Sequence, residues 1–231
     1  CIFHFGVSNT SNSEKVSFKN VTVHWYFGNE TEERVATFNN LKNIIPEEEQ
    51  LGVYINGNIP ILYEKSVSDI PNLNSFGLYG VGLEEIKPGA FDNLPHLESI
   101  IVIFNNLTEI KTGTFTNLNI SQIHLSSNSI IRLQQGAFKN FNADFMQLAN
   151  NQLTEILDGV FENVTIGSLS LANNRLHTIP PEALSTVGLT SLRLFKNNFE
   201  EINPEVFNMH ELNPRRCFQQ HQTLYLKSRR Q

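Results

Sequence analysis

A unit of 23 or 24 residues repeats along most of this chain, and it limits the fold more than any other feature of the sequence. Each unit follows the spacing L-x-x-L-x-L-x-x-N-x-L-x-x-I, with apolar residues at the L and I positions and a Phe late in the unit. The units start 24, 23, 23, 23 and 23 residues apart, at Leu73, Leu97, Ile120, Ala143, Ile166 and Leu189. Self-similarity at such a period predicts a stack of similar units that bury one continuous core.

The apolar positions of each unit predict the core of this stack. The L-x-L pair fits a short strand, because side chains alternate along a strand and both leucines then point inward. The second member of the pair is expected to be buried in every unit: Leu78, Val102, Leu125, Leu148, Leu171 and Leu194. The late Phe is expected to fill the core from the other side: Phe91, Phe115, Phe138, Phe161 and Phe207. Leu184 takes that place in one unit, and Val81 replaces the Asn in another.

An Asn recurs at the turn that follows each strand: Asn105, Asn128, Asn151, Asn174 and Asn197. A buried amide without hydrogen-bond partners would cost about 1–3 kcal/mol, so a recurring buried Asn implies recurring partners. We therefore predict that these side chains are structural and bond the backbone of their own and of the neighbouring unit.

These residues resemble the leucine-rich-repeat family, specifically the typical extracellular subclass with Phe late in each unit. The resemblance implies an α/β solenoid: a leucine-rich-repeat horseshoe with a concave parallel β-sheet, repeats of 23–24 residues and a mostly irregular convex side. It also implies that the chain binds another macromolecule.

The two ends of the chain depart from the repeat. We expect residues 1–31 to form a hairpin-like N-terminal cap, with strands at Val16–Phe18 and Val21–Val23. Residues 32–211 are expected to form the solenoid, with Val35–Phe38 as a degenerate first strand. Residues 212–231 would be an abbreviated C-terminal cap with a basic tail, since Asn213–Cys217 matches the N-P-x-x-C opening of the family's cap.

Two cysteines, Cys1 and Cys217, lie at opposite ends of the predicted stack. Seven or eight strands at about 4.8 Å separate them by more than about 30 Å, whereas a disulfide tolerates about 7 Å between Cα atoms. They are thus expected to be either unpaired or bonded to another chain, which would give a disulfide-linked oligomer. A non-covalent oligomer is the alternative.

Several weak signals favour a secreted, extracellular glycoprotein. N-x-S/T sequons mark glycosylation candidates at Asn9, Asn20, Asn29, Asn106, Asn119 and Asn163. Their number is close to chance, but the repeat subclass and the cap fragment point the same way. No apolar run reaches the roughly 18 residues of a membrane span.

Charge and motifs exclude several functions. The formal charge is −6, and five of the 17 basic residues follow Met209, so the body is more acidic than the whole chain. An acidic body repels phosphate, so nucleic acid is not an expected partner. The common catalytic and cofactor motifs are absent from the sequence. We therefore expect no enzyme activity, no cofactor and no metal, and we interpret His124 on the concave face as a binding contact.

The concave face is the predicted binding site, because strand residues between the inward leucines must point outward. The candidate contact residues are Tyr54, Tyr79, Ile101, Ile103, Phe104, His124, Phe145, Arg193 and Phe195. Apolar side chains such as Ile101 and Ile103 on a solvent face generally mark contacts. The alternative is that the cap, a glycan or the tail covers them.

The expected ligand is a protein or a glycoconjugate. Cys1–Phe3 and Arg34–Pro46 are similar to the start of insect haemolymph leucine-rich-repeat immune proteins, which implies innate-immune recognition or complex assembly. A receptor ectodomain or a matrix adhesion protein is the first alternative. A binder of an apolar small molecule or lipid is the second, although an open sheet encloses little.

Overall fold

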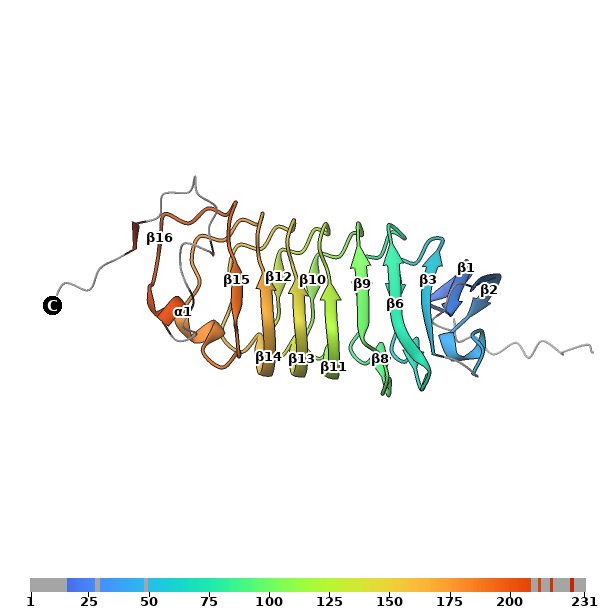
Figure 1. Cartoon of the computed structure of the whole chain (residues 1–231). Coiled ribbons are helices and arrows are strands. Elements are labelled where there is room, and N and C mark those ends of the chain that lie inside the picture. Colours follow the sequence, from blue (N-terminus) through green and yellow to red (C-terminus); the bar gives the residue numbers. More distant parts are fainter. Residues whose placement is uncertain are drawn as a thin grey trace, which may run out of the picture.

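The computed structural model describes residues 16–27, 30–47 and 50–208, together with positions 212, 217 and 225–226. Its strands stand side by side in a stack that runs from the N-terminal β1 and β2 to β15 and β16 (Figure 1). Nine of them form one sheet in the order β15-β14-β13-β11-β9-β6-β3-β1-β2, and the strands from β3 to β15 pair in parallel. The predicted parallel-strand solenoid is confirmed.

The bounds of the sheet strands are β1 Phe18–Phe27, β2 Glu30–Phe38, β3 Leu51–Asn56, β6 Leu73–Tyr79, β9 Ser99–Ile103, β11 Phe115–His124, β13 Phe138–Gln147, β14 Phe161–Ser170 and β15 Ser191–Arg193. Shorter strands pair elsewhere in each turn: β4 Ile61–Leu62, β5 Val67–Ser68, β7 Glu85–Ile86, β8 Phe91–Asp92, β10 Glu109–Ile110, β12 Arg132–Leu133, β16 Glu201–Ile202 and β17 Tyr225–Leu226. The helical segments are short: η1 Leu41–Asn43, η2 Pro181–Leu184 and α1 Glu205–Asn208.

The core has the composition that the repeat predicts. The inward strand residues Leu78, Val102, Leu125, Leu148, Leu171 and Leu194 are fully buried. The late phenylalanines stack from unit to unit, with ring centroids 5.8 Å apart for Phe91 and Phe115 and 5.4 Å apart for Phe115 and Phe138. Leu184 is buried at the position where its unit lacks the Phe.

The recurring asparagines form a buried ladder of hydrogen bonds. Asn151 donates through Nδ2 to the carbonyls of Leu148, 3.1 Å away in its own unit, and Leu125, 3.0 Å away in the preceding unit. Its Oδ1 accepts from the backbone N–H of Ile130 at 3.0 Å. The same pattern recurs at the other ladder positions, so each amide satisfies backbone groups that the turn would otherwise leave buried and unpaired. The predicted structural role is confirmed.

A change of repeat length alters the strands midway along the stack. Pro71 and Pro95 lie between the late apolar residue and the L-x-L pair that follows it, in the part of the chain where the late residues Val67, Phe91 and Phe115 are spaced 24 residues apart. Proline lacks an N–H donor, so β5 and β8 end early and β6 and β9 begin anew. The units without this proline form the ten-residue strands β11, β13 and β14, which start at the late Phe. These strands are longer than the repeat predicts.

The N-terminal segment differs from the expected arrangement. Val16–Phe18 and Val21–Val23 do not form two strands; most of this stretch lies in β1, with an irregularity in pairing between Phe18 and Val21. β1 pairs antiparallel with both β2 and β3. Val35–Phe38 therefore belongs to an antiparallel hairpin at the sheet edge, and the parallel stack begins at β3. The apolar alternation of residues 35–38 suits a strand with a parallel or an antiparallel neighbour, so the sequence alone does not distinguish the two arrangements.

Cys217 lies near the C-terminal end of the stack and is only 2% exposed. Its backbone carbonyl accepts a hydrogen bond from the N–H of Leu194 at 2.8 Å. Burial raises the pKa of its thiol to about 11. A bridge to another chain would require this side chain to leave the core. Cys1 lies outside the described residues.

We predict that Asn151→Ala lowers the free energy of unfolding by about 3 kcal/mol, because it leaves three buried backbone groups without their partner. Urea denaturation followed by circular dichroism measures this. The matched control is Asn142→Ala, which removes an exposed amide from β13 and should cost less than about 0.5 kcal/mol. Equal losses in the two variants would show that the ladder amide is not structural.

We also predict that Cys217 reacts slowly with iodoacetamide in the folded protein. A pKa raised from 9.0 to about 11 reduces the reactive thiolate at pH 8 about 100-fold. Peptide-resolved mass spectrometry should find rapid labelling at this residue only in denaturant. Rapid labelling of the native protein would show that the side chain is accessible.

Candidate functional site

The strand registers define an open face, the surface of the nine-stranded sheet whose side chains point away from the Leu core. One row crosses the middle of it from β2 to β15: Glu33, His24, Tyr54, Gly77, Ile101, His124, Gln147, Ser170 and Arg193. A second row runs parallel to it: Thr31, Tyr26, Gly52, Ser75, Ser99, Gln122, Phe145, Ser168 and Ser191. A third row holds Val35, Thr22 and Asn56 on β2, β1 and β3. It continues with Tyr79 on β6, which pairs with Ile103 on β9.

The structure brings most of the predicted contact residues together on this face. Tyr79 is 44% exposed, Phe145 51% and Phe104 67%, and Arg193 is also exposed. The others are partly exposed: Tyr54, Ile101, Ile103, His124 and Phe195. Arg193 and Phe195 lie at the β15 end, beyond the small side chains of β14, so they are separated from the apolar group near the N-terminal end.

The cap adds two aromatic side chains that sequence reasoning missed. His24 of β1 stacks on Tyr54 of β3, with ring centroids 4.4 Å apart and an interplanar angle of 7°. Its Nδ1 lies 3.1 Å from Oε2 of Glu33, and its Nε2 lies 3.1 Å from Nδ2 of Asn56. Tyr26, also on β1, is exposed beside them. The alternation of Val21–Val23 predicts a strand in a hairpin-like cap, but it does not predict that this strand pairs with β3.

Two glycines allow tyrosine rings to lie over the backbone of the open face. A Cβ atom at Gly52 would lie 2.1–2.5 Å from ring and hydroxyl atoms of Tyr26. A Cβ atom at Gly77 would lie 2.7 Å from Cε2 of Tyr79. These distances are far inside van der Waals contact, so any larger residue would displace the rings. The glycines therefore make room for this orientation of both tyrosines.

The face is uncharged over most of its width. Between β1 and β14 the three rows contain no Lys, Arg, Asp or Glu, and the charged members Glu33 and Arg193 lie near opposite ends. Burial lowers the pKa of His124, which favours its neutral form. Burial and the nearby Tyr26 raise the pKa of Tyr79, which favours the neutral phenol.

Phe104 has a backbone conformation that its side chain disfavours. Its φ is 57°, in the left-handed region that bulky residues rarely adopt. The equivalent positions of the following units share this positive φ but carry Ser127, Asn150, Asn173 and Lys196. The phenyl ring gains little from burial, so neither backbone preference nor core packing explains Phe104. Strained residues with no packing role are often functional.

We predict that Phe104→Asn stabilises the protein by about 0.5–1 kcal/mol, because Asn tolerates the left-handed conformation. Thermal and urea denaturation measure the change. The control is Asn150→Phe, the reverse exchange at an equivalent position, which should destabilise by a similar amount. A loss of stability in Phe104→Asn would mean that the ring has a packing role.

The described sequons lie at the surface. Asn20, Asn106, Asn119 and Asn163 are all exposed, and Asn9 and Asn29 lie outside the described residues. Asn163 donates to Oδ1 of Asn140, and Asn140 donates to Oδ1 of Asn117. These three asparagines share a positive φ and form a second, exposed amide ladder that the sequence reading did not identify.

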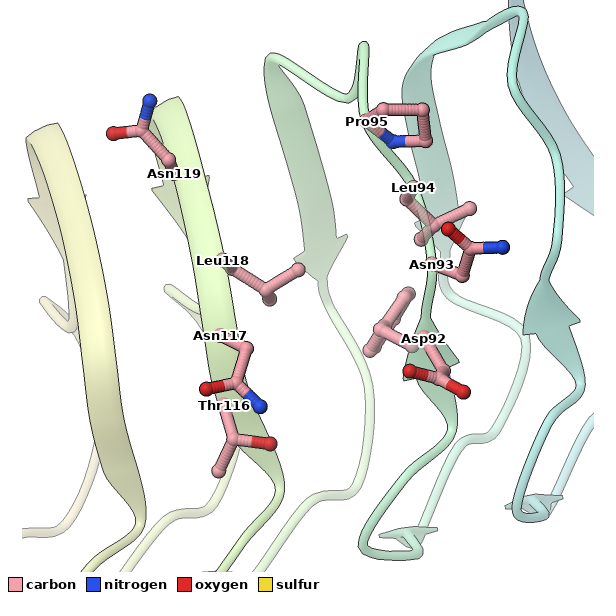
Figure 2. Close-up of a pocket in the computed structure, with 9 residues that line it drawn as sticks. Asp92, Asn93, Leu94, Pro95, Thr116, Asn117, Leu118 and Asn119 are labelled. Carbon is pink, nitrogen blue, oxygen red and sulfur yellow. The ribbon is translucent and has the colours of Figure 1, made fainter.

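A polar notch lies where the repeat length changes. It has a volume of about 430 Å³, and Figure 2 shows Asp92–Pro95 on one side and Thr116–Asn119 on the other. No backbone hydrogen bond joins residues 91–97 to residues 115–120. The exposed amide ladder is also interrupted here: Asn93 donates to Oδ1 of Asp69 in the preceding unit, but no hydrogen bond joins Asn117 to Asn93. The amide and carboxylate groups that line the notch make it a poor site for a lipid or another apolar ligand.

The described residues contain no group of three or more His, Cys, Asp or Glu side chains that could hold a metal ion. Among the described helices, none is long and apolar enough to cross a membrane.

The stacked repeats, the buried amide ladder and the exposed aromatic face define a leucine-rich-repeat solenoid, a scaffold that typically binds other molecules rather than catalysing reactions. A model of the BspA-type leucine-rich repeat region matches residues 84–213 in six copies. Because this match covers more than half of the chain, the protein belongs to the BspA-type leucine-rich-repeat family. Comparison with curated proteins gives no significant match.

Proposed function

We propose that this protein binds a protein partner through the N-terminal two-thirds of its open face. The observation that carries the proposal is the uncharged group of exposed and partly exposed aromatic and aliphatic side chains there: Tyr26, Tyr54, Tyr79, Ile101, Ile103, Phe104 and Phe145. Aromatic side chains dominate binding energy when a partner excludes water from them. Depletion of charged residues at the centre of a patch is typical of protein interfaces.

The polar members of the face support a protein ligand as well. Ser, Gly, Asn and Gln surround the tyrosines, which is the composition that antibody paratopes use to combine rigid aromatic contacts with adaptable hydrogen bonds. His24 stacks on Tyr54, and Gly52 and Gly77 leave room for the Tyr26 and Tyr79 rings to lie against the sheet before binding. Preorganised side chains lose less entropy when the complex forms.

We further propose that the protein acts outside the cell as a glycoprotein. The support is that all four described sequons are exposed and that none of them lies in the three rows of the open face, so glycans would leave the binding face accessible. Recognition or complex assembly in innate immunity is the role that we favour, on the similarity of residues 34–46 noted above.

We predict that a photoreactive residue at Ile103 crosslinks a defined protein from native extracts. The same residue at Leu157, an exposed position outside the open-face rows, is the matched control and should not capture that protein. Mass spectrometry identifies the captured chain. Crosslinking of the same protein with equal yield from both positions, or from Leu157 alone, would place the interaction elsewhere.

The captured partner then permits a quantitative test. Replacing both Ile101 and Ile103 by Ser should weaken binding by at least about 1 kcal/mol, or roughly fivefold in Kd, if either is a hot spot. Since both side chains are half-buried between their neighbours, the variant should lose about 1.5–3 kcal/mol of stability. Calorimetric titration beside thermal denaturation separates the two effects. Unchanged affinity in a folded variant would contradict the proposal.

A further inference from the structure

The outer edge of β2 is unpaired. β2 is the last strand of the nine-stranded sheet at the end opposite β15 (Figure 1). Its inner edge pairs with β1 in a regular register from Glu30 to Ala36. Within the described residues, no strand pairs with its other edge. Every second residue of β2 therefore directs its backbone N–H and C=O groups away from the sheet, where another strand could bond them.

This edge lacks most of the features that prevent strand addition. β2 has nine residues, more than the usual length of about five or six, and it contains no Pro or Gly. Its one irregularity in pairing lies at the far end, between Phe18 and Val21 of β1. The side chains of Glu30–Val35 are all exposed, and Val35 is 64% exposed on the open face. What remains to select a partner is the charge of the strand.

The first half of β2 is acidic. It carries Glu30, Glu32 and Glu33 within four residues, and the residues opposite them on β1, at positions 24–27, include no Lys or Arg. Nδ1 of His24 lies 3.1 Å from Oε2 of Glu33, whose side chain is still 68% exposed. Among the described residues, Glu30 and Glu32 have no ion-pair partner. Basic side chains on an added strand would lie directly opposite these carboxylates, and opposite charges across strands attract.

The cations of the hairpin lie toward its other end. They are Lys19, which comes just after the start of β1, and Arg34, which follows the acidic half of β2. Strand alternation places Arg34 on the face that points away from Glu33 and Val35. An added strand would thus extend the open face with a basic residue opposite Glu33 and an apolar residue opposite Val35.

A second copy of β2 is a poor match for this edge. Antiparallel self-pairing about a two-fold axis keeps both open faces on one side, so residues that lie opposite each other come from the same face. A register that sets Arg34 opposite Glu32 then sets Glu33 opposite its own copy at the axis. A register that sets Arg34 opposite Glu30 does the same to Glu32. Like charges directly opposite one another destabilise a pair of strands.

We propose that the free edge of β2 binds an extended basic segment of another protein, which adds to the sheet as a further strand. Basic side chains of this segment lie opposite Glu30, Glu32 and Glu33. This edge is a second interaction surface, and the inference does not rest on the proposed function of the apolar group on the open face.

The test measures the binding of labelled peptides to the folded chain by fluorescence anisotropy. The peptide Thr-Val-Thr-Lys-Lys-Thr-Lys-Thr matches β2 when it runs antiparallel, and the peptide of reversed sequence matches it when it runs parallel. At least one of them should bind. The same peptide with Glu in place of Lys should bind about tenfold more weakly or worse.

N-methylation distinguishes strand addition from attraction between charges alone. A paired strand donates to its neighbour through alternate N–H groups, so methylating one alternate set of the peptide removes these donors and methylating the other set does not. One methylated peptide should lose binding and the other should retain most of it. Equal effects of both would show that no strand pairing takes place and would overturn the inference.

Variants of the chain locate the bound peptide. Replacing both Glu30 and Glu32 by Gln should weaken binding about tenfold. The matched control replaces Glu155 and Glu200 by Gln, which changes the net charge equally at exposed positions outside β2, and should alter binding less than about twofold. Hydrogen exchange over residues 30–38 should slow in the complex. Equal losses in the two variants, or slowed exchange elsewhere only, would contradict the inference.

Two further outcomes would also overturn it. If neither basic peptide binds, the glutamates only keep the edge free of partners. If the chain alone forms a dimer that slows exchange over residues 30–38, a second copy occupies the edge. The variant with Ser at positions 101 and 103 should bind the peptide normally, so a failure of this inference and a failure of the proposed function are separate results.

Discussion

The register between neighbouring units is the constraint on which the rest of the structure depends. Each buried Asn bonds a carbonyl of its own unit and one of the preceding unit, while the leucines beneath it pack against the leucines of both neighbours. A slip of one residue would turn the leucines outward and leave the amides without partners. Because a slip would cost both buried apolar surface and buried hydrogen bonds, the strands are fixed relative to one another. The side chains on the open face of the sheet are therefore fixed relative to one another as well.

Because the register is fixed, the position of a residue in its repeat determines where its side chain lies on the open face. Residues that share a row lie one strand spacing apart, whichever unit they come from, so the positions between the inward leucines can vary without disturbing the core. The cap extends this lattice, because β1 pairs antiparallel with β3 and places His24 directly beside Tyr54. The segment that shields the first unit from solvent therefore also contributes to the candidate binding surface.

The repeat could be read from the sequence because the same residue types recur at a constant period in the strand, the turn and the late Phe. The cap could not, since Val35–Phe38 has apolar alternation that suits a parallel or an antiparallel neighbour equally. The long strands β11, β13 and β14 were also missed, because their formation depends on the absence of a proline, which carries no positive signal. Outward residues such as Tyr79 and Phe145 followed directly from strand alternation. Tyr26 and the positive φ of Phe104 required the three-dimensional pairing.

One unit of the sheet indicates which outward residues the fold itself requires. The unit of β14 has the same Leu core and the same ladder Asn as the units before it, yet its outward residues are Ser168, Ser170 and Ala172. A repeat of this type thus folds without large apolar groups on its open face. The outward tyrosines Tyr26, Tyr54 and Tyr79 are not a requirement of the solenoid, and Phe104 is exposed in a conformation that Asn or Ser adopts more readily. Folding explains neither their size nor their exposure, and this supports the proposal that these residues contact another molecule.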